Sequence, residues 1–184
     1  MLQRISRSLC RLEQQAAGLC ALLITALIIL NVSTRAMNQA VFWLDEAAIF
    51  VMVWMLFLAM SVLLKQRQAV AVTVLVDLLP PAMRRLVGVV IDLLVLLFAV
   101  LLLAFCWNWY TPLDLLRHGF DMEAFSAATM NFMYQSRANT LPLHKFWVWL
   151  IVPYFALSVC LHSLANLLAD PSGRHMDKTA GAAA

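Results

Sequence analysis

Four long apolar runs alternate with charged connections along the chain. Each is at least 18 residues long, and they cover residues 16–34, 47–64, 86–110 and 146–168. A bilayer core about 30 Å thick needs about 20 such residues in a helix. Backbone exposed to lipid must satisfy its own hydrogen bonds, and barrel-type alternation is absent from the sequence. The pattern therefore predicts an all-α integral membrane protein with four transmembrane helices.

The connections predict smaller elements around one transmembrane domain, residues 1–170. Residues 69–79 are apolar but too short to span, so we expect an interfacial or re-entrant helix before Pro80, with Pro81 opening the third span. The long loop 111–145 mixes charged and apolar residues, which predicts one or two short amphipathic helices on the membrane surface. The polar, alanine-rich tail 171–184 is expected to be disordered.

Basic residues indicate an orientation. Nine of the thirteen Lys and Arg residues fall in the N-terminal segment, the second connection and the tail. The positive-inside rule then places both termini in the cytoplasm. Tryptophan and tyrosine prefer the membrane interface. Seven of them fall at the predicted outer ends: Trp43, Trp107, Trp109, Tyr110, Trp147, Trp149 and Tyr154.

Composition agrees with a lipid solvent and offers little chemistry. Hydrophobic residues make up 64% of the 184 and charged residues 12%, whereas soluble domains carry about 25% charged residues. The four cysteines form no redox or zinc spacing, and no phosphate loop or hydrolase motif is present. We therefore expect no enzyme activity, no catalytic, substrate-binding or metal site, no cofactor and no nucleic-acid partner.

Two polar side chains lie inside predicted spans. Asp92 is the only acid well within one, and intramembrane charges are functional hypotheses by default. We expect it to form an ion pair with Lys65, Arg67 or a partner's basic residue, and an ion- or proton-carrying role is the alternative. His162 is the only histidine in a span. It is expected to be a hydrogen-bonded packing residue rather than a haem ligand.

Acidic and aromatic residues mark the start of the second span. Asp45 and Glu46 are expected to complement the helix dipole and to bond free N–H groups. An aromatic stripe on one helical face follows, which would contact either lipid or a second membrane protein: Trp43, Phe50, Trp54 and Phe57.

The order of several short segments resembles the small membrane subunit of tripartite ATP-independent periplasmic (TRAP) transporters. The resemblance covers about residues 10–170 and rests on spacing rather than on a catalytic signature. It is carried by 43–46 (WLDE), 57–60 (FLAM), 64–67 (LKQR), 70–80, 92–94 (DLL), 136–142 leading to Trp147, and Pro153.

The resemblance implies a scaffold in a bacterial inner membrane. The family's large membrane subunit holds the sodium and substrate sites and moves as an elevator, while a periplasmic binding protein delivers an organic acid, such as a carboxylate or sulfonate. The small subunit would enlarge the static part and contact membrane lipids. Residues expected to face the partner or anchor the chain are Trp43, Asp45, Glu46, Trp54, Lys65, Arg67 and Asp92.

Two alternatives remain open. A small four-helix membrane enzyme, redox or lipid-modifying, would need paired cysteines, paired histidines or a polar cleft. An oligomeric channel acting alone would need a repeated polar stripe along one helix. The sequence shows neither pattern plainly.

Overall fold

The computed structural model describes residues 1–66 and 80–168. The expected interfacial helix at 69–79, Arg67 and the tail 171–184 lie outside these residues. Four long helical segments are present: α1 (Leu2–Ala36), α2 (Trp43–Gln66), α4 (Pro81–Tyr110), and α7 (Lys145–Trp149) continuing into α8 (Ile151–Leu167). All four are long and apolar enough to cross a membrane. The prediction of an all-α membrane protein with four such helices is therefore confirmed.

The first helix is much longer than its apolar run. It begins at Leu2, although the run that predicted a span begins at residue 16. The predicted span was bounded at residue 16 because charged and polar residues precede it. The helical backbone nevertheless extends through those residues to Leu2. Its 35 residues correspond to a length of about 52 Å at 1.5 Å per residue.

Prolines set the boundaries of the later helices. Pro81 opens α4, as predicted, because a first-turn residue needs no N–H partner. Pro112 disfavours helical backbone at the preceding residue, and Thr111 accordingly ends α4 at φ 36°. Pro153 cannot donate to the carbonyl four residues earlier, at Trp149. The break between α7 and α8 falls at Leu150, beside that carbonyl.

Two short helices follow α4, as the loop composition predicted: α5 (Pro112–Arg117) and α6 (Met122–Thr129). Asp121 caps α6, because its carboxylate accepts from the backbone N–H groups of Glu123 and Ala124 at 2.9 and 3.1 Å. The loop then returns to α7 without further helix.

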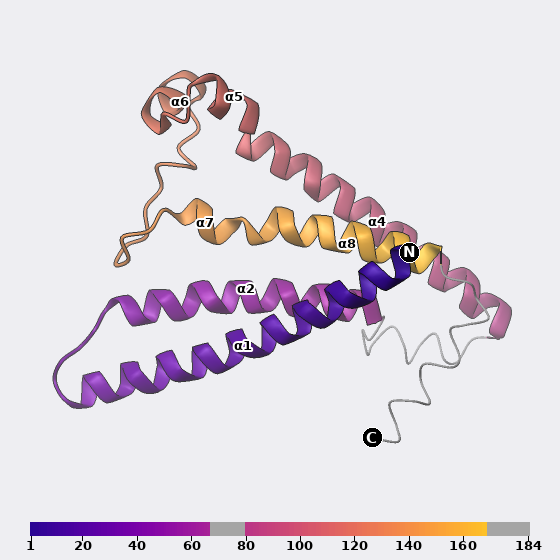
Figure 1. Ribbon diagram of the computed structural model, residues 1–184, viewed down its shortest axis with the longest axis horizontal. Helices are drawn as coiled ribbons and strands as arrows, with labels where there is room; N and C mark the ends of the chain where they lie inside the picture. Colours follow the sequence, from indigo (N-terminus) through magenta and orange to yellow (C-terminus); the bar gives the residue numbers. More distant parts are fainter. Residues whose placement is uncertain (67–79, 169–184) are drawn as a thin grey trace.

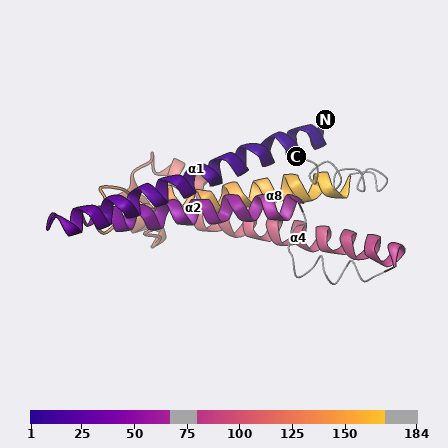
Figure 2. The ribbon, with the colours of Figure 1, turned by 90° about the horizontal axis from the view of Figure 1, so that it is seen from below.

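The long helices lie side by side in the order α1, α2, α8, α4 (Figure 1). The N-terminal part of α1 crosses over to reach α8 as well, where the Gln3 side chain donates to the carbonyl of Ala165. Figure 2 shows this part of α1 on one side of α2 and α8, with α4 on the other. We call the end with the N-terminus, Gln66 and Leu167 the terminal end, and the opposite end, with connections 37–42 and 111–144, the loop end.

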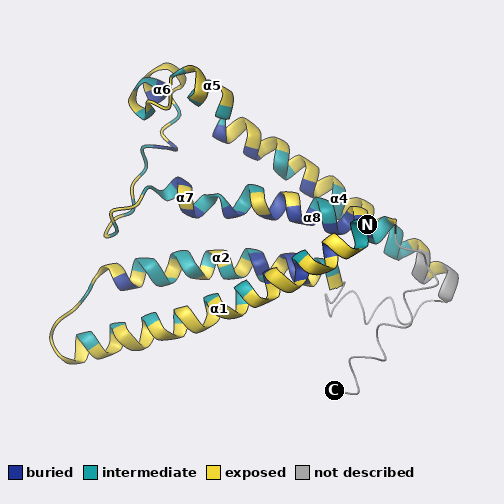
Figure 3. Cartoon of the chain, viewed as in Figure 1, coloured by how far each residue is buried: buried dark blue, intermediate teal, exposed yellow. Residues whose placement is uncertain are grey.

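Buried apolar residues form two clusters. One joins α4 to α8 through Ala99, Phe155 and Val159, and Phe57 of α2 packs edge-on to Phe155 at a ring distance of 5.2 Å. The second fixes the loop to the ends of α4 and α7, and consists of Cys106, Tyr110, Phe125, Met133, Tyr134 and Phe146. We call this second group the loop-end cluster. Most of α1 is exposed (Figure 3), so lipid or another protein must cover it.

Candidate functional site

A buried glutamate at the terminal end is the most unusual feature of the described chain. Glu13 of α1 is 1% exposed. In the sequence it only marks where the first apolar run begins. A buried carboxylate is costly unless hydrogen bonds or charges compensate it, so its surroundings define a candidate site.

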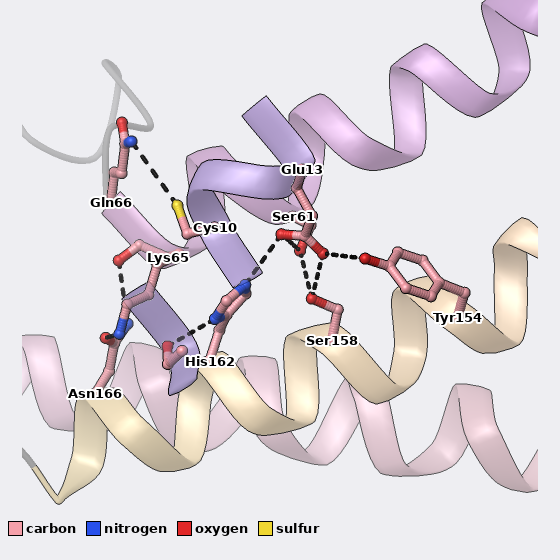
Figure 4. Close-up of polar contacts among 10 residues, drawn as sticks. Cys10, Glu13, Ser61, Lys65, Gln66, Tyr154, Ser158, His162 and Asn166 are labelled. Carbon is pink, nitrogen blue, oxygen red and sulfur yellow. Dashed lines mark hydrogen bonds and ion pairs between the residues drawn. The ribbon is translucent and has the colours of Figure 1, made fainter. Parts of the chain in front are cut away.

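Four donors from two other helices meet this carboxylate (Figure 4). Oε1 accepts from the hydroxyls of Ser158 and Tyr154 at 2.5 and 3.2 Å. Oε2 lies 3.0 Å from the Ser61 hydroxyl and 3.1 Å from Nε2 of His162. The two serine oxygens are also 3.0 Å apart. Glu13 therefore ties α1 to α2 and α8 at one point.

The histidine in this group has partners on both ring nitrogens. His162 is 1% exposed, and its Nδ1 lies 2.8 Å from the hydroxyl of Ser6 on α1. A neutral ring with its proton on Nε2 donates to Glu13 and accepts from Ser6. The expectation of a hydrogen-bonded packing histidine is therefore confirmed. We call Ser6, Glu13, Ser61, Tyr154, Ser158 and His162 the Glu13 network.

The Glu13 network is suited to holding helices together rather than to binding a ligand. A carboxylate offers about four acceptor positions, and four donors occupy them. No acceptor position remains for a cation, and the donors around it are already in use. Across residues 1–66 and 80–168, no three His, Cys, Asp or Glu side chains are placed so that they could hold a metal ion.

The network belongs to a polar stripe on α8 that sequence analysis missed. Tyr154, Ser158, His162 and Asn166 recur every four residues and so lie along one side of the helix. Asn166 adds a further contact between α8 and α2. Its Oδ1 accepts from Lys65 Nζ at 2.9 Å, and its Nδ2 donates to the Lys65 carbonyl at 3.4 Å. The side chains of the stripe hydrogen-bond to α1 and α2 of the same chain.

Tyr154 also contributes a donor to the network. It was predicted at the outer membrane interface with the other aromatic residues. Its hydroxyl donates to Glu13, and the other α8 partners of that carboxylate, Ser158 and His162, lie farther toward the terminal end. The side chain is still 39% exposed, and its place at the membrane interface stays a prediction.

A second polar contact secures the loop end. The Glu46 carboxylate of α2 accepts from the backbone N–H groups of Asn139, Thr140 and Leu141 at 2.8, 2.6 and 3.2 Å. It also accepts from the Thr140 hydroxyl at 2.6 Å. The carboxylate therefore holds the segment before α7 against the start of α2.

The predicted helix-capping role of the two acids needs correction. Asp45 and Glu46 do lie in the first turn of α2, where negative charge suits the helix dipole. Their hydrogen bonds nevertheless go elsewhere. Asp45 pairs with Arg35 at 2.5 Å and accepts from the Asn31 amide, which joins the end of α1 to the start of α2.

The aromatic stripe on α2 has partners within the chain. The Trp54 indole donates to the Val148 carbonyl of α7 at 2.9 Å, and Phe57 packs against Phe155 of α8. Trp43 is 44% exposed. Trp54 and Phe57 thus have contacts within the chain, although Trp54 is still 39% exposed. Whether the exposed part of the stripe faces lipid or a second membrane protein stays a prediction.

Asp92 and Lys65 are not members of the Glu13 network. Asp92 on α4 is 4% exposed and contacts none of the network's side chains through a described hydrogen bond. Its predicted ion pair stays a prediction. Lys65 is half-buried near the end of α2, and Arg67 lies outside the described residues.

Removing the Glu46 carboxylate should free the loop. In Glu46→Ala, the amides of Asn139, Thr140 and Leu141 lose their acceptor, so their deuterium uptake should rise roughly ten-fold. Hydrogen-exchange mass spectrometry of the purified protein measures this. Glu123→Ala removes an exposed acid from α6 and is the matched control. Unchanged uptake at 139–141 in Glu46→Ala would contradict the contact.

Together these features define a class of protein: a four-helix membrane protein in which a buried carboxylate and its donors join three of the helices. The chain belongs to the family of tripartite ATP-independent periplasmic transporters, DctQ component, whose model matches residues 24–171. Membership makes it a TRAP transporter small permease subunit, a multi-pass protein of the inner membrane.

One curated relative illustrates the similarity. The chain is 32% identical over 89 residues to the C4-dicarboxylate TRAP transporter small permease protein DctQ of Vibrio cholerae serotype O1. That alignment covers 48% of this chain and 38% of the relative, so the chain spans well under half of that protein's length. No solved structure matches the chain significantly.

Proposed function

We propose that this chain is the non-catalytic scaffold subunit of a sodium-coupled secondary importer of an organic acid. The observation that carries the proposal is the Glu13 network. Among the described residues, this network is the only large group of buried polar side chains, and it joins helices of the same chain. A static subunit needs such joints and needs no substrate site.

The partners follow from the same proposal. A large membrane subunit would hold the substrate and sodium sites, and a periplasmic binding protein would deliver a carboxylate or sulfonate. With both termini cytoplasmic, the loop end would face the periplasm. The residues proposed to contact the large subunit or the membrane interface are Trp43, Asp45, Glu46, Trp54, Lys65, Arg67 and Asp92.

The decisive experiment is a tagged pull-down from native membranes in mild detergent, followed by mass spectrometry. A stoichiometric large polytopic partner supports the scaffold role, especially if a periplasmic binding protein joins it after crosslinking. A clean homo-oligomer without such a partner would contradict it. The alternatives, an enzyme or a channel acting alone, would then be tested in the purified chain.

Asp92 provides a second test. We expect Asp92→Ala to lower the yield of the complex several-fold. Asp92 is buried, so removing its carboxylate leaves the groups that contact it without their partner. The complex that still forms should bind substrate with an affinity within about two-fold of the wild type, because Asp92 is not expected to contact the substrate site. Normal assembly with altered sodium dependence would instead assign ion binding to Asp92.

A further inference from the structure

The first turns of α1 have two chemically different faces. Ser6, Cys10 and Glu13 are buried against the neighbouring helices. Arg4, Arg7 and Arg11 are exposed. At 100° per residue the three arginines fall within roughly 60° of one another, on the side away from the buried face. They form one basic stripe, which we call the arginine stripe.

No acid of the described chain neutralises this stripe. Ion pairs described within residues 1–66 and 80–168 involve Arg35, Arg117 and His162, and none of them involves Arg4, Arg7 or Arg11. Arg7 makes one polar contact, from its Nε to the Gln3 carbonyl at 3.4 Å, within its own helix. Glu13, the nearest acid in sequence, points the other way and is occupied by its four donors.

Exposed apolar side chains lie beside the arginines. Ile5 is 48% exposed and Leu12 is 62% exposed. On the helical wheel they lie roughly 100° from the centre of the stripe, between it and the buried face. Positive charge next to exposed aliphatic groups is the arrangement of helices that lie in a membrane interface.

The length of α1 places this segment at headgroup level. The uncharged run 16–34 alone fills a hydrocarbon core of about 30 Å. The fourteen helical residues before it add roughly 21 Å at the terminal end. Arg11 therefore lies at the depth of the lipid headgroups, and the long side chains of Arg7 and Arg4 follow on the outer side and can reach toward the lipid phosphates, whichever leaflet the terminal end faces.

We propose that Arg4, Arg7 and Arg11 form a binding surface for anionic phospholipid headgroups. Three guanidiniums that pair with no acid of residues 1–66 and 80–168 attract a negative membrane surface, and Ile5 and Leu12 reach the acyl chains beneath it. The Glu13 network fixes the rotation of α1, so that the stripe always faces outward. The inference does not depend on the identity of the transporter's partner or substrate.

Native mass spectrometry of the full chain tests the proposal. The protein is purified in detergent containing equal amounts of phosphatidylglycerol and phosphatidylcholine, and retained lipids are counted. We expect a preference for phosphatidylglycerol that weakens as salt rises. In the triple variant Arg4→Gln/Arg7→Gln/Arg11→Gln the preference should fall on the order of ten-fold or more.

The triple lysine variant at the same positions is the matched control. It keeps the charge and the helix, so it should keep the lipid preference. If the glutamine variant retains the wild-type preference, the proposal is wrong. It is equally overturned if the glutamine variant loses only a protein partner in a pull-down, because the stripe is then a protein interface.

Discussion

Glu13→Ala is expected to lower the free energy of unfolding by about 3 kcal/mol. The substitution leaves two serine hydroxyls, one phenol and one imidazole without their acceptor in a buried site. Hydrogen bonds between membrane helices contribute roughly 0.6–2 kcal/mol each, and the cost of several losses at one point accumulates. Unfolding of the purified chain by SDS in mixed micelles, followed by circular dichroism, measures the change.

Two variants on the same helix sharpen this test. Glu13→Gln keeps one strong acceptor oxygen and should lose only about 1 kcal/mol. Gln14→Ala changes the exposed neighbouring residue and should stay within about 0.5 kcal/mol of the wild type. If Glu13→Ala unfolds at the same SDS fraction as Gln14→Ala, the carboxylate does not join the helices.

Phe125→Ala should open the loop end without unfolding the long helices. Phe125 is 0% exposed and packs edge-on to Tyr134 at 5.3 Å, and Tyr134 packs in turn on Phe146. Removing a fully buried phenylalanine costs about 3–5 kcal/mol. Tyr134 should then detach from the end of α4, where its hydroxyl donates to the Tyr110 carbonyl at 2.7 Å.

Limited proteolysis measures that opening. When a segment opens and closes faster than it is cut, the cleavage rate follows its open population. A loss of about 3 kcal/mol should therefore speed cleavage within 118–141 by roughly a hundred-fold. Phe132→Ala, at a phenylalanine 58% exposed in the same loop, should change it little. Equal cleavage of the two variants would show that the loop-end cluster does not hold the loop.

The long helices could be predicted because lipid imposes a simple rule. A run of about 20 apolar residues has to be helical in a bilayer, so hydrophobicity locates the spans without knowledge of packing. Proline chemistry likewise located the start of α4 at Pro81. No such rule located the N-terminal extension of α1, because it mixes polar and apolar residues and is held by contacts with α8.

The Glu13 network could not be predicted in the same way. A glutamate at the edge of an apolar run usually marks the membrane boundary, and its partners Ser61 and Ser158 are ordinary small residues of membrane helices. The available signal was the four-residue spacing of Tyr154, Ser158, His162 and Asn166 on α8. Even that stripe identifies no partner, because the partner lies on a helix about 150 residues earlier.

That separation has a consequence for biogenesis. Glu13 leaves the ribosome 149 residues ahead of His162, which at a translation rate of about 5–20 residues per second means roughly seven to thirty seconds. During this interval α1 and α2 can insert as a hairpin, but the carboxylate lacks three of its four donors until α8 enters the bilayer. The contact between α1, α2 and α8 at Glu13 is therefore complete only after the last span has been inserted. A chain truncated before α8 therefore leaves the Glu13 carboxylate without three of its four donors.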